Sequence, residues 1–409
     1  MDSSEPAQEA GKITHTAPAS AAPAKQSYAK EINLLRSFSF SVYMTQAVVV
    51  SYLPLYFLDQ GFSTGQIGVL YSTGPFISIF ANLIMGLVSD KYHTLKKLFP
   101  ILLIGQLLMI ALLFPSPAFL SVCFIMIAFY FFQTPMNPLT DSLILLSSQH
   151  TGTPYSLVRI FGSLGFALSA YGFGLLLKET GTDTTLILAL CTIGITLAFS
   201  FTLKDYQGSL RKMEFGGFYQ LIRKPQIISF FVIILIVSIS HRMYEGFLAV
   251  TMRQMGASDS LVGLAWLMSA VSEIPILFLL GKYGHKFKEL PLLVIASLMY
   301  ALRFWLVSVI DSPEWLIPVQ AMHSVSFGIY FATALRYITS IIPDEYRSSG
   351  QALYAVVWTG VAGVISGTVG GSIYEAFGKD SFFQLAMTLA LIAAAGFFIQ
   401  HVRSNRVLK

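Results

Sequence analysis

Long apolar stretches alternate with short polar segments along almost the whole chain. Each stretch approaches the roughly 20 residues that an α-helix needs to cross about 30 Å of hydrocarbon. The stretches run over residues 34–58, 65–88, 98–114, 118–148, 155–177, 184–203, 226–250, 259–281, 290–310, 315–341, 349–373 and 381–402. This pattern predicts an all-α membrane protein with twelve transmembrane helices.

The basic residues are divided unequally between the two sides of this predicted bundle. About 19 of the 26 Lys and Arg lie in the terminal segments and in alternate loops, all on one side. Basic residues collect on the cytoplasmic side of a membrane. We therefore expect a multi-pass protein of the plasma membrane, that is, a bacterial inner membrane, surrounded by lipid and with both termini in the cytoplasm.

The polar segments also divide the chain into parts. Residues 1–30 are rich in Ala, Pro, Ser and Lys and contain no apolar block of the signal-peptide type, which predicts a disordered cytoplasmic tail. The longest interior loop, 204–225, lies on the cytoplasmic side between two predicted six-helix bundles, 31–203 and 226–402. Residues 403–409 form a second cytoplasmic tail.

The two predicted bundles resemble one another in sequence. The first loop of the first half reads 61-GFSTGQIG-68, and the corresponding loop of the second half reads 256-GASDSLVG-263. One common spacing relates the glycines of the two halves, which are Gly61, Gly68 and Gly86 in the first and Gly256, Gly263 and Gly281 in the second. Two six-helix pseudo-repeats are typical of a transporter whose substrate site lies between the halves, near the middle of the membrane.

Composition excludes several other classes of protein. The chain is 55% hydrophobic and only 11% charged, unlike a soluble protein. Its net charge of +5 comes from loop residues that set the membrane orientation, so we expect no nucleic-acid partner. The two cysteines have no metal-ligand spacing, and no HExxH, GxSxG or Walker motif is present. We therefore expect no enzyme activity, no metal and no cofactor, with a proton gradient as the energy source.

Two charged residues fall within the predicted helices of the first half. Arg159 lies in 155-YSLVRIFGSLGFAL-168, and Asp141 lies on the preceding helix. Both are about nine residues from the middle of the connecting loop, so in an antiparallel hairpin they lie at the same height, roughly 13 Å into the membrane. Charges inside a membrane are costly and usually functional. We predict that Asp141 and Arg159 meet.

The second half also carries ionisable residues at membrane depth. His241 and Glu245 are spaced i, i+4, which places them on one helix face. Measured from their loop, His241 and Glu273 are equidistant and are expected to face each other; Arg303 and His323 have nearly matched heights. Carboxyl and imidazole groups exchange protons near neutral pH when burial tunes them. This composition favours a proton relay or an anion or polyol site.

The segment 86-GLVSDKYHTLKK-97 resembles the signature loop of the major facilitator superfamily. It contains a glycine, then Asp90, then Lys91 and further lysines. The resemblance implies a gating role for Asp90 with Lys91 at the cytoplasmic end of the helices. The alternative is an ordinary solvated run of charges that orients the helix.

The segment 159-RIFGSLGFAL-168 resembles the fifth helix of the lactose permease family, and more closely its phenylpropionate permease-like branch. This resemblance covers nearly the whole chain and implies that Asp141 and Arg159 bind substrate. It further implies that Glu273 contacts substrate and couples to protons, together with His323 and Arg303.

The chain differs from lactose permease at three of the positions that this resemblance implicates. Phe166 replaces a sugar-stacking tryptophan, Ser326 replaces a tenth-helix acid, and Gln320 replaces a basic residue. The proton path therefore has an alternative course through Glu245 and His241. Aromatic residues that can line a cavity include Tyr43, Tyr52, Phe161, Phe166, Tyr244, Tyr354 and Trp358, of which Phe166, Tyr244 and Trp358 are predicted substrate contacts alongside His323.

We therefore expect a secondary transporter that functions as a monomer and imports a small organic solute with protons. Sugars, nucleosides and phenylpropionate-like aromatic acids all remain candidates. An acid would suit Arg159 as a carboxylate clamp, and a sugar would suit the Asp141–Arg159 pair. A uniporter or an exporter of drugs or lipids is the alternative, because a fold alone does not fix coupling or direction.

Overall fold

The computed structural model describes residues 25–92, 94–116, 118–205, 223–343 and 346–407. The helices of the first half are α1 (Lys25–Ala47), η1 (Val48–Tyr52), α2 (Leu53–Asp59), α3 (Thr64–Tyr92), α4 (Leu98–Leu113), α5 (Phe119–Gln133), α6 (Met136–Thr151), α7 (Tyr155–Thr180), η2 (Thr182–Thr184) and α8 (Thr185–Thr202). Those of the second half are α10 (Pro225–Gln254), α11 (Asp259–Tyr283), η3 (Gly284–Lys286), α12 (Glu289–Val309), η4 (Pro313–Trp315), α13 (Leu316–Ala321), η5 (Ser324–Gly328), α14 (Ile329–Ile341), α15 (Arg347–Ala355), η7 (Val356–Val361) and α16 (Ala362–Val407).

These helices account for the twelve predicted membrane crossings. Within the described residues, nine helical stretches are long and apolar enough to span a bilayer. One of them, Gly350–Ser404, is divided by the non-helical backbone of Gly378 and so makes two crossings. The shorter apolar helix Leu98–Leu113 and the combined segment 316–341 supply the remaining two. The all-α membrane fold predicted from hydropathy is confirmed.

The ends of the predicted parts are only partly described. Helix α1 begins at Lys25, ahead of the predicted start of the first bundle. The rest of the predicted tail, 1–24, and most of the central loop, 206–222, lie outside the described residues.

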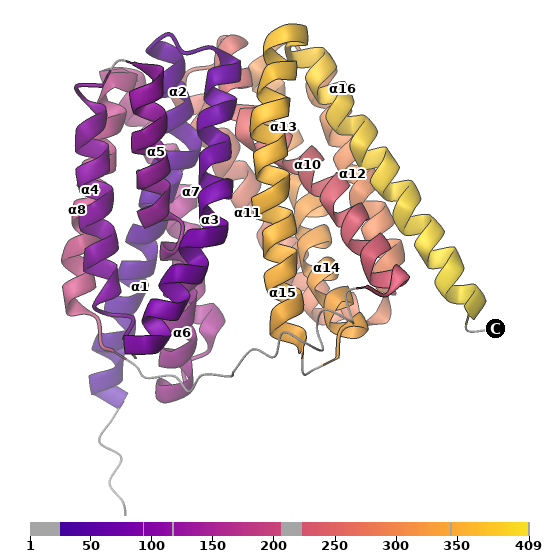
Figure 1. Ribbon diagram of the computed structural model, residues 1–409, viewed down its shortest axis with the longest axis horizontal. Helices are drawn as coiled ribbons and strands as arrows, with labels where there is room; N and C mark the ends of the chain where they lie inside the picture. Colours follow the sequence, from indigo (N-terminus) through magenta and orange to yellow (C-terminus); the bar gives the residue numbers. More distant parts are fainter. Residues whose placement is uncertain (1–24, 93, 117, 206–222, 344–345, 408–409) are drawn as a thin grey trace, which may run out of the picture.

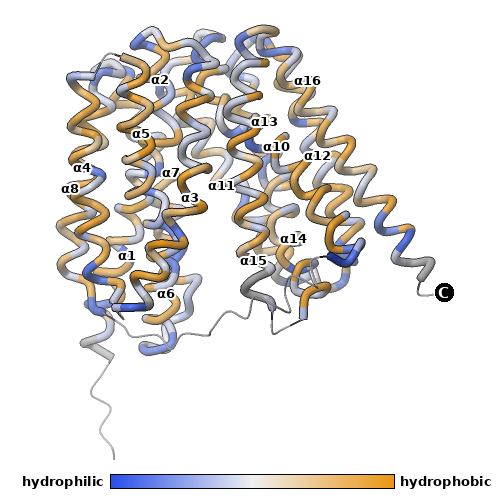
Figure 2. Tube along the Cα trace, in the orientation of Figure 1, coloured by the Kyte–Doolittle hydropathy of each residue, from blue (hydrophilic) through white to orange (hydrophobic). Residues whose placement is uncertain are grey.

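The two halves of the chain lie side by side (Figure 1). Helix α3 packs against α16, and α7 packs against α11, and smaller contacts of α2 with α10 and of α3 with η7 also join the halves. Apolar residues follow the length of the helices, whereas hydrophilic residues gather toward their ends (Figure 2). Large apolar side chains such as Phe278 and Leu120 are exposed on the bundle surface, as lipid-facing residues are.

Two of the three glycine pairs related by the sequence repeat have equivalent structural roles. Gly61 and Gly256 both adopt positive φ, 86° and 90°, in the turns that start α3 and α11. A Cβ on Gly68 would lie 2.2 Å from the carbonyl oxygen of Gly367, and one on Gly263 would lie 2.3 Å from that of Ala170. Each of the latter two glycines therefore lets a helix of one half touch a helix of the other.

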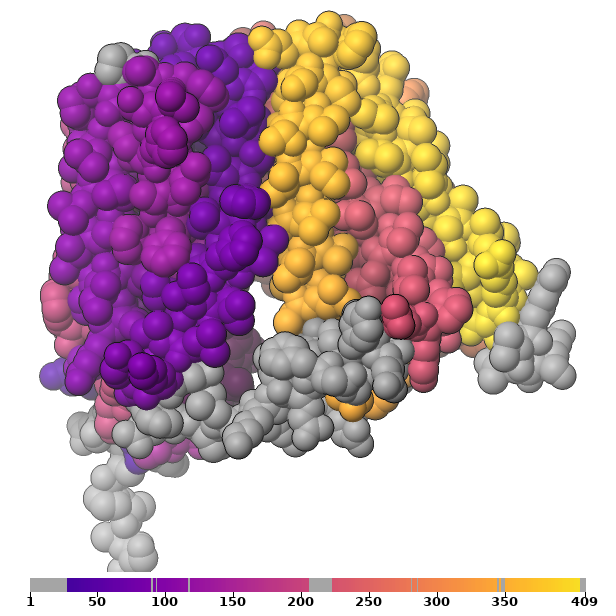
Figure 3. All heavy atoms as spheres, in the orientation of Figure 1, coloured from indigo at the N-terminus to yellow at the C-terminus, as the bar shows by residue number. Residues whose placement is uncertain are grey.

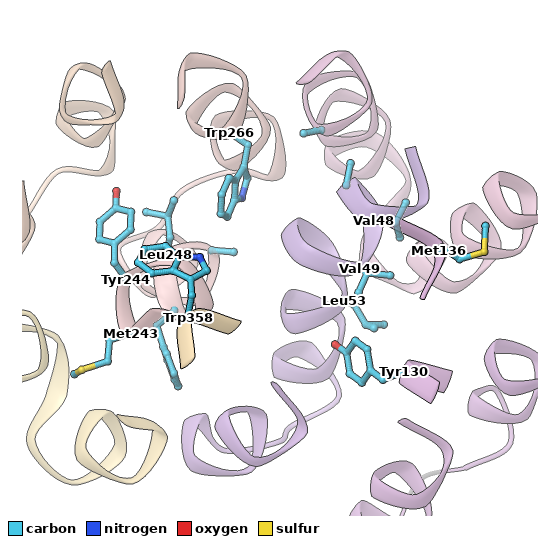
Figure 4. Packing of buried hydrophobic residues seen from close by; sticks show 14 of the residues in the cluster. Val48, Val49, Leu53, Tyr130, Met136, Met243, Tyr244, Leu248, Trp266 and Trp358 are labelled. Carbon is cyan, nitrogen blue, oxygen red and sulfur yellow. The ribbon is translucent and has the colours of Figure 1, made fainter. Parts of the chain in front are cut away.

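These contacts close one end of the molecule, and the other end is open. Glu375 of the second half accepts hydrogen bonds from Ser63 Oγ (3.1 Å) and from the amide of Gly65 (3.0 Å), at the N-terminus of α3. At the opposite end, where α1 begins and α16 ends, the space-filling view shows a gap between the halves (Figure 3). Deeper inside, buried residues of the two halves face each other across the interface (Figure 4).

We expect Gly68→Ala to prevent full closure at the α3–α16 contact, because the added methyl group would overlap a backbone carbonyl of the other half. Spin labels on Glu179 and Glu314, in a cysteine-free background, would report a longer distance than in the parent protein. Gly86→Ala is the matched control, because it lies on the same helix and has no atom within 4 Å of the new Cβ. Unchanged distances in Gly68→Ala would contradict the assigned role.

The predicted gating loop is described only in part. The side chain of Asp90 lies outside the described residues, and Lys91 is exposed with its Nζ 5.5 Å from the Tyr92 ring centroid. The described carboxylate at this loop is Asp205, which accepts hydrogen bonds from the amides of Leu95 (3.1 Å) and Lys96 (3.3 Å). The gating role of Asp90 and Lys91 stays a prediction.

Candidate functional site

The predicted pair of the first half forms. Arg159 Nε of α7 lies 2.9 Å from Asp141 Oδ1 of α6, with side chains 27% and 37% exposed. Arg159 Nη2 also donates to the hydroxyl of Tyr43 on α1 (2.5 Å), and the guanidinium lies 4.4 Å from the centre of that ring. The pair thus joins three helices and stays partly accessible.

In the second half, Arg303 organises a buried polar network. Its side chain is fully buried on α12, and its Nη2 donates to Gln320 Oε1. The amide of Gln320 in turn donates to Tyr244 OH (2.6 Å), while Ser269 Oγ donates to Gln320 Oε1 (2.7 Å). Gln320, where lactose permease has a basic residue, is therefore a neutral bridge that satisfies Arg303 and Tyr244 together.

The same arginine fixes the protonation of His323. Arg303 Nη1 lies 2.8 Å from His323 Nδ1, and an arginine donates hydrogen bonds only. Nδ1 must therefore accept, which places the ring proton on Nε2. That atom lies 2.8 Å from Glu273 Oε1 and donates to it. Arg303 and His323, for which matched heights were predicted, are thus in direct contact, and His323 is neutral in this arrangement.

The expectation that His241 faces Glu273 is wrong. Glu273 of α11 pairs with His323, whereas His241 of α10 is buried and lies 3.8 Å, through Nε2, from Glu245 Oε2. Equal distance from a turn sets the depth of two residues but not the direction in which each points. Helix α11 packs chiefly against α7, α13 and η5 rather than against α10, so its acid meets the histidine that precedes η5.

Four ionisable groups nevertheless form one series. Glu273 contacts His323, the rings of His323 and His241 have centroids 6.1 Å apart, and His241 approaches Glu245. Among the described residues, Nδ1 of His241 is buried without a hydrogen-bond partner. The sequence left two proton paths open, one through Glu273 and His323 and one through His241 and Glu245. The structure joins them in a single cluster, which has Glu273 at one end and Glu245 at the other.

Arg242, which was not among the predicted site residues, completes this cluster. Its Nη1 lies 2.6 Å from Glu245 Oε2, one turn along the same helix. Its other nitrogens donate to neutral acceptors of η7, Nε to Trp358 O (3.4 Å) and Nη2 to Thr359 Oγ1 (3.2 Å). Arg242 and Glu245 are 24% and 32% exposed, so both remain reachable.

Three π-helical segments in the described part of the chain lie beside these residues. η5 directly follows His323, η7 contains Trp358, and η1 interrupts the first crossing. Tyr71 OH lies 2.9 Å from Val50 O and 3.1 Å from Val49 O, both in η1. A π segment leaves carbonyls without their usual partners and is frequent at functional sites. Hydropathy does not reveal such segments, because they keep the apolar pattern.

The three aromatic residues predicted to contact substrate lie in different places: Phe166 lies where the two halves meet, whereas Tyr244 and Trp358 are buried in the second half. Phe166 makes an edge contact with Trp266, 5.9 Å between centroids, where α7 meets α11. Tyr244 and Trp358 are 2% and 5% exposed. Both side chains are therefore buried, and the guanidinium groups of Arg303 and Arg242 lie 4.2 and 5.9 Å from the respective ring centroids. A direct contact of these three aromatics with a ligand stays a prediction.

Comparison with known proteins agrees with this architecture. The model described as the "MFS_1 like family" matches residues 33–385. The chain is 26% identical to a probable 3-phenylpropionic acid transporter of Escherichia coli (strain K12) over 88% of this chain and 95% of that protein. It is 25% identical to the maltose permease of Geobacillus stearothermophilus over 83% and 86% of the two chains.

A solved structure has the same fold. The crystal structure of the nucleoside transporter NupG superposes with a TM-score of 0.80, covering 90% of this chain and 98% of that one. At 14% identity the likeness concerns the fold alone.

Proposed function

Since the chain belongs to the MFS_1 like family and is thus an integral membrane transporter for small molecules rather than an enzyme, we propose that it is a proton-coupled symporter. It imports a small organic solute by alternating access, as a monomer, with both termini in the cytoplasm. The gap at the end that carries the termini then corresponds to an inward-facing state (Figure 3).

The observation that carries this proposal is the series Glu273, His323, His241 and Glu245. Ionisable groups at membrane depth are costly and are kept where they move ions or bind substrate. Here carboxylates and imidazoles are in contact or close to it, so a proton can be held among them without full exposure to water. Proton uptake and solute binding are coupled if the protonation state of this cluster must balance the charge of the bound solute.

Asp141 and Arg159 supply the substrate contact of the first half. Arg159 contacts Asp141 through Nε and Tyr43 through Nη2, so its third nitrogen, Nη1, takes part in neither contact. A donor beside a carboxylate binds the hydroxyl groups of a sugar or nucleoside, and a guanidinium also binds an acid. A solute held between this pair and the cluster of the second half would contact both moving bodies, as alternating access requires.

A ligand screen tests this proposal. Thermal unfolding of the purified protein is measured with maltose, uridine and 3-phenylpropionate, at about pH 6 and about pH 8. A ligand that binds the folded state raises the unfolding temperature, and a symported solute is expected to do so more strongly at the lower pH. Stabilisation that does not change with pH for any ligand would argue against proton coupling.

A further inference from the structure

Among the described residues, three arginines at membrane depth are held in different ways. Arg303 is fully buried, and Arg159 ties α7 to α6 and α1. Arg242 instead pairs with Glu245 of its own helix, spaced i, i+3, so this ion pair joins no two helices. A pair that is partly exposed and holds no elements together contributes little to stability. Its retention at membrane depth therefore points to ligand or proton chemistry.

The guanidinium of Arg242 would stay in place without its counterion. Two of its three nitrogens already donate to Trp358 O and Thr359 Oγ1. Protonation of Glu245 would remove the negative charge at Nη1 but leave these two contacts intact. The result is an oriented, unpaired cation that can bind a carboxylate.

The pair lies where a substrate passing between the halves can reach it. A Cβ on Gly246, next to Glu245, would lie 3.8 Å from the ring of Tyr71 in the first half. In η7, a Cβ on Gly360 would lie 2.9 Å from Ile79 of α3. Arg242 is thus held between two segments that both adjoin the first half.

The charges in this region balance when no proton is bound. Three arginines oppose three carboxylates, since Arg159 lies by Asp141, Arg242 by Glu245, and Arg303 joins Glu273 through neutral His323. One added proton leaves a net charge of +1, which a monoanion neutralises. A neutral solute would leave that charge uncompensated in a low-dielectric site.

We propose that the transported solute is an organic carboxylate. When Glu245 takes up a proton, Arg242 gives up its ion pair with Glu245 and binds the carboxylate of the solute instead. This inference rests on the proposed symport and names its substrate class. The groups around Glu245 are Arg242 and His241 on α10, His323 at the start of η5, Tyr300 on α12 and Tyr71 on α3. Of these, Arg242 alone makes a close ion pair with it.

Binding of two acids and their neutral amides tests this assignment. The probes are 3-phenylpropionate and glucuronate with 3-phenylpropionamide and glucuronamide, measured by calorimetry at about pH 6 and about pH 8, where carboxylates of this kind stay ionised. The parent protein is expected to prefer an acid over its amide and to bind it up to about tenfold more tightly per unit fall in pH, because one proton is taken up.

Variants separate the two members of the pair. Arg242→Gln should weaken acid binding about tenfold to a hundredfold and change amide binding little. Glu245→Gln should bind the acid with almost no pH dependence. The double variant removes both charges, so neither is left unpaired, and should lose the acid preference while remaining folded. Arg253→Gln, on the same helix but paired with Asp259 at its end, is the matched control and should keep the preference.

The possible failures are distinguishable. If Arg242→Gln and the double variant keep the preference for the acid, or if the parent protein binds neither acid, the inference is overturned, even when uridine or maltose binds. If an acid binds with the expected pH dependence but is not transported into proteoliposomes, the assignment of Arg242 stands and the proposed function fails.

Discussion

Arg159→Ala is expected to lower substrate affinity about a hundredfold or more, while the protein remains inserted and folded. The change removes the donors that face Asp141 and Tyr43 and leaves Asp141 unpaired at the site. Loss of hydrogen bonds to a charged group, together with an unbalanced carboxylate, accounts for an effect of this size. Titration calorimetry with the best ligand from the screen measures it.

Two further variants control for folding. Arg159→Lys keeps a positive charge near Asp141 but loses the fork by which Arg159 contacts Asp141 through Nε and Tyr43 through Nη2. This variant should therefore fold normally and bind substrate weakly. Lys178→Ala, at the exposed end of the same helix, should bind like the parent protein. Normal transport by Arg159→Ala would remove this residue from the substrate site.

Arg303→Met is expected to give the second large effect, on stability as well as transport. Arg303 is fully buried and donates to His323 and Gln320. Its loss leaves His323 Nδ1 without its donor and removes the cation that balances Glu273 through His323. We expect a loss of about 3 kcal/mol, since an unpaired charge inside a protein is costly, and no proton-driven accumulation. Thermal unfolding and uptake measure the two parts.

A double variant separates charge from packing. Arg303→Met combined with Glu273→Gln removes both charges, so much of the lost stability should return while accumulation stays absent. Leu302→Ala, exposed on the same helix, is the control and should change neither quantity strongly. If the double variant were as unstable as the single one, the role of Arg303 would be packing rather than charge balance.

Hydropathy alone predicted most of the fold, because every crossing needs an apolar stretch of similar length. Equal distance from a turn correctly brought Asp141 to Arg159, since consecutive antiparallel helices α6 and α7 are in contact. The same rule failed for His241 and Glu273, because equal depth does not set the direction in which a side chain points, and Glu273 points to His323 instead. Depth can be read from a sequence, whereas helix neighbours depend on the whole bundle.

The role of Arg242 could not be read from the sequence for a related reason. Its partner Glu245 was visible at i, i+3, but its neutral acceptors, Trp358 O and Thr359 Oγ1, lie more than a hundred residues away in a π segment. Without those contacts nothing in the sequence assigned a specific role to this arginine. The repeat of glycines was readable because positive φ and close backbone contact both exclude larger residues.

Solute accumulation in proteoliposomes distinguishes a proton symporter from a facilitator. With a proton gradient directed inward and the best ligand from the screen outside, we expect uptake above the external concentration, abolished by a protonophore. Ser326 stands where lactose permease has an acid, and its hydroxyl donates to Met322 O (2.9 Å), so this comparison also asks whether the Glu273–Glu245 cluster suffices for coupling. Equilibration without accumulation would contradict symport and identify a facilitator.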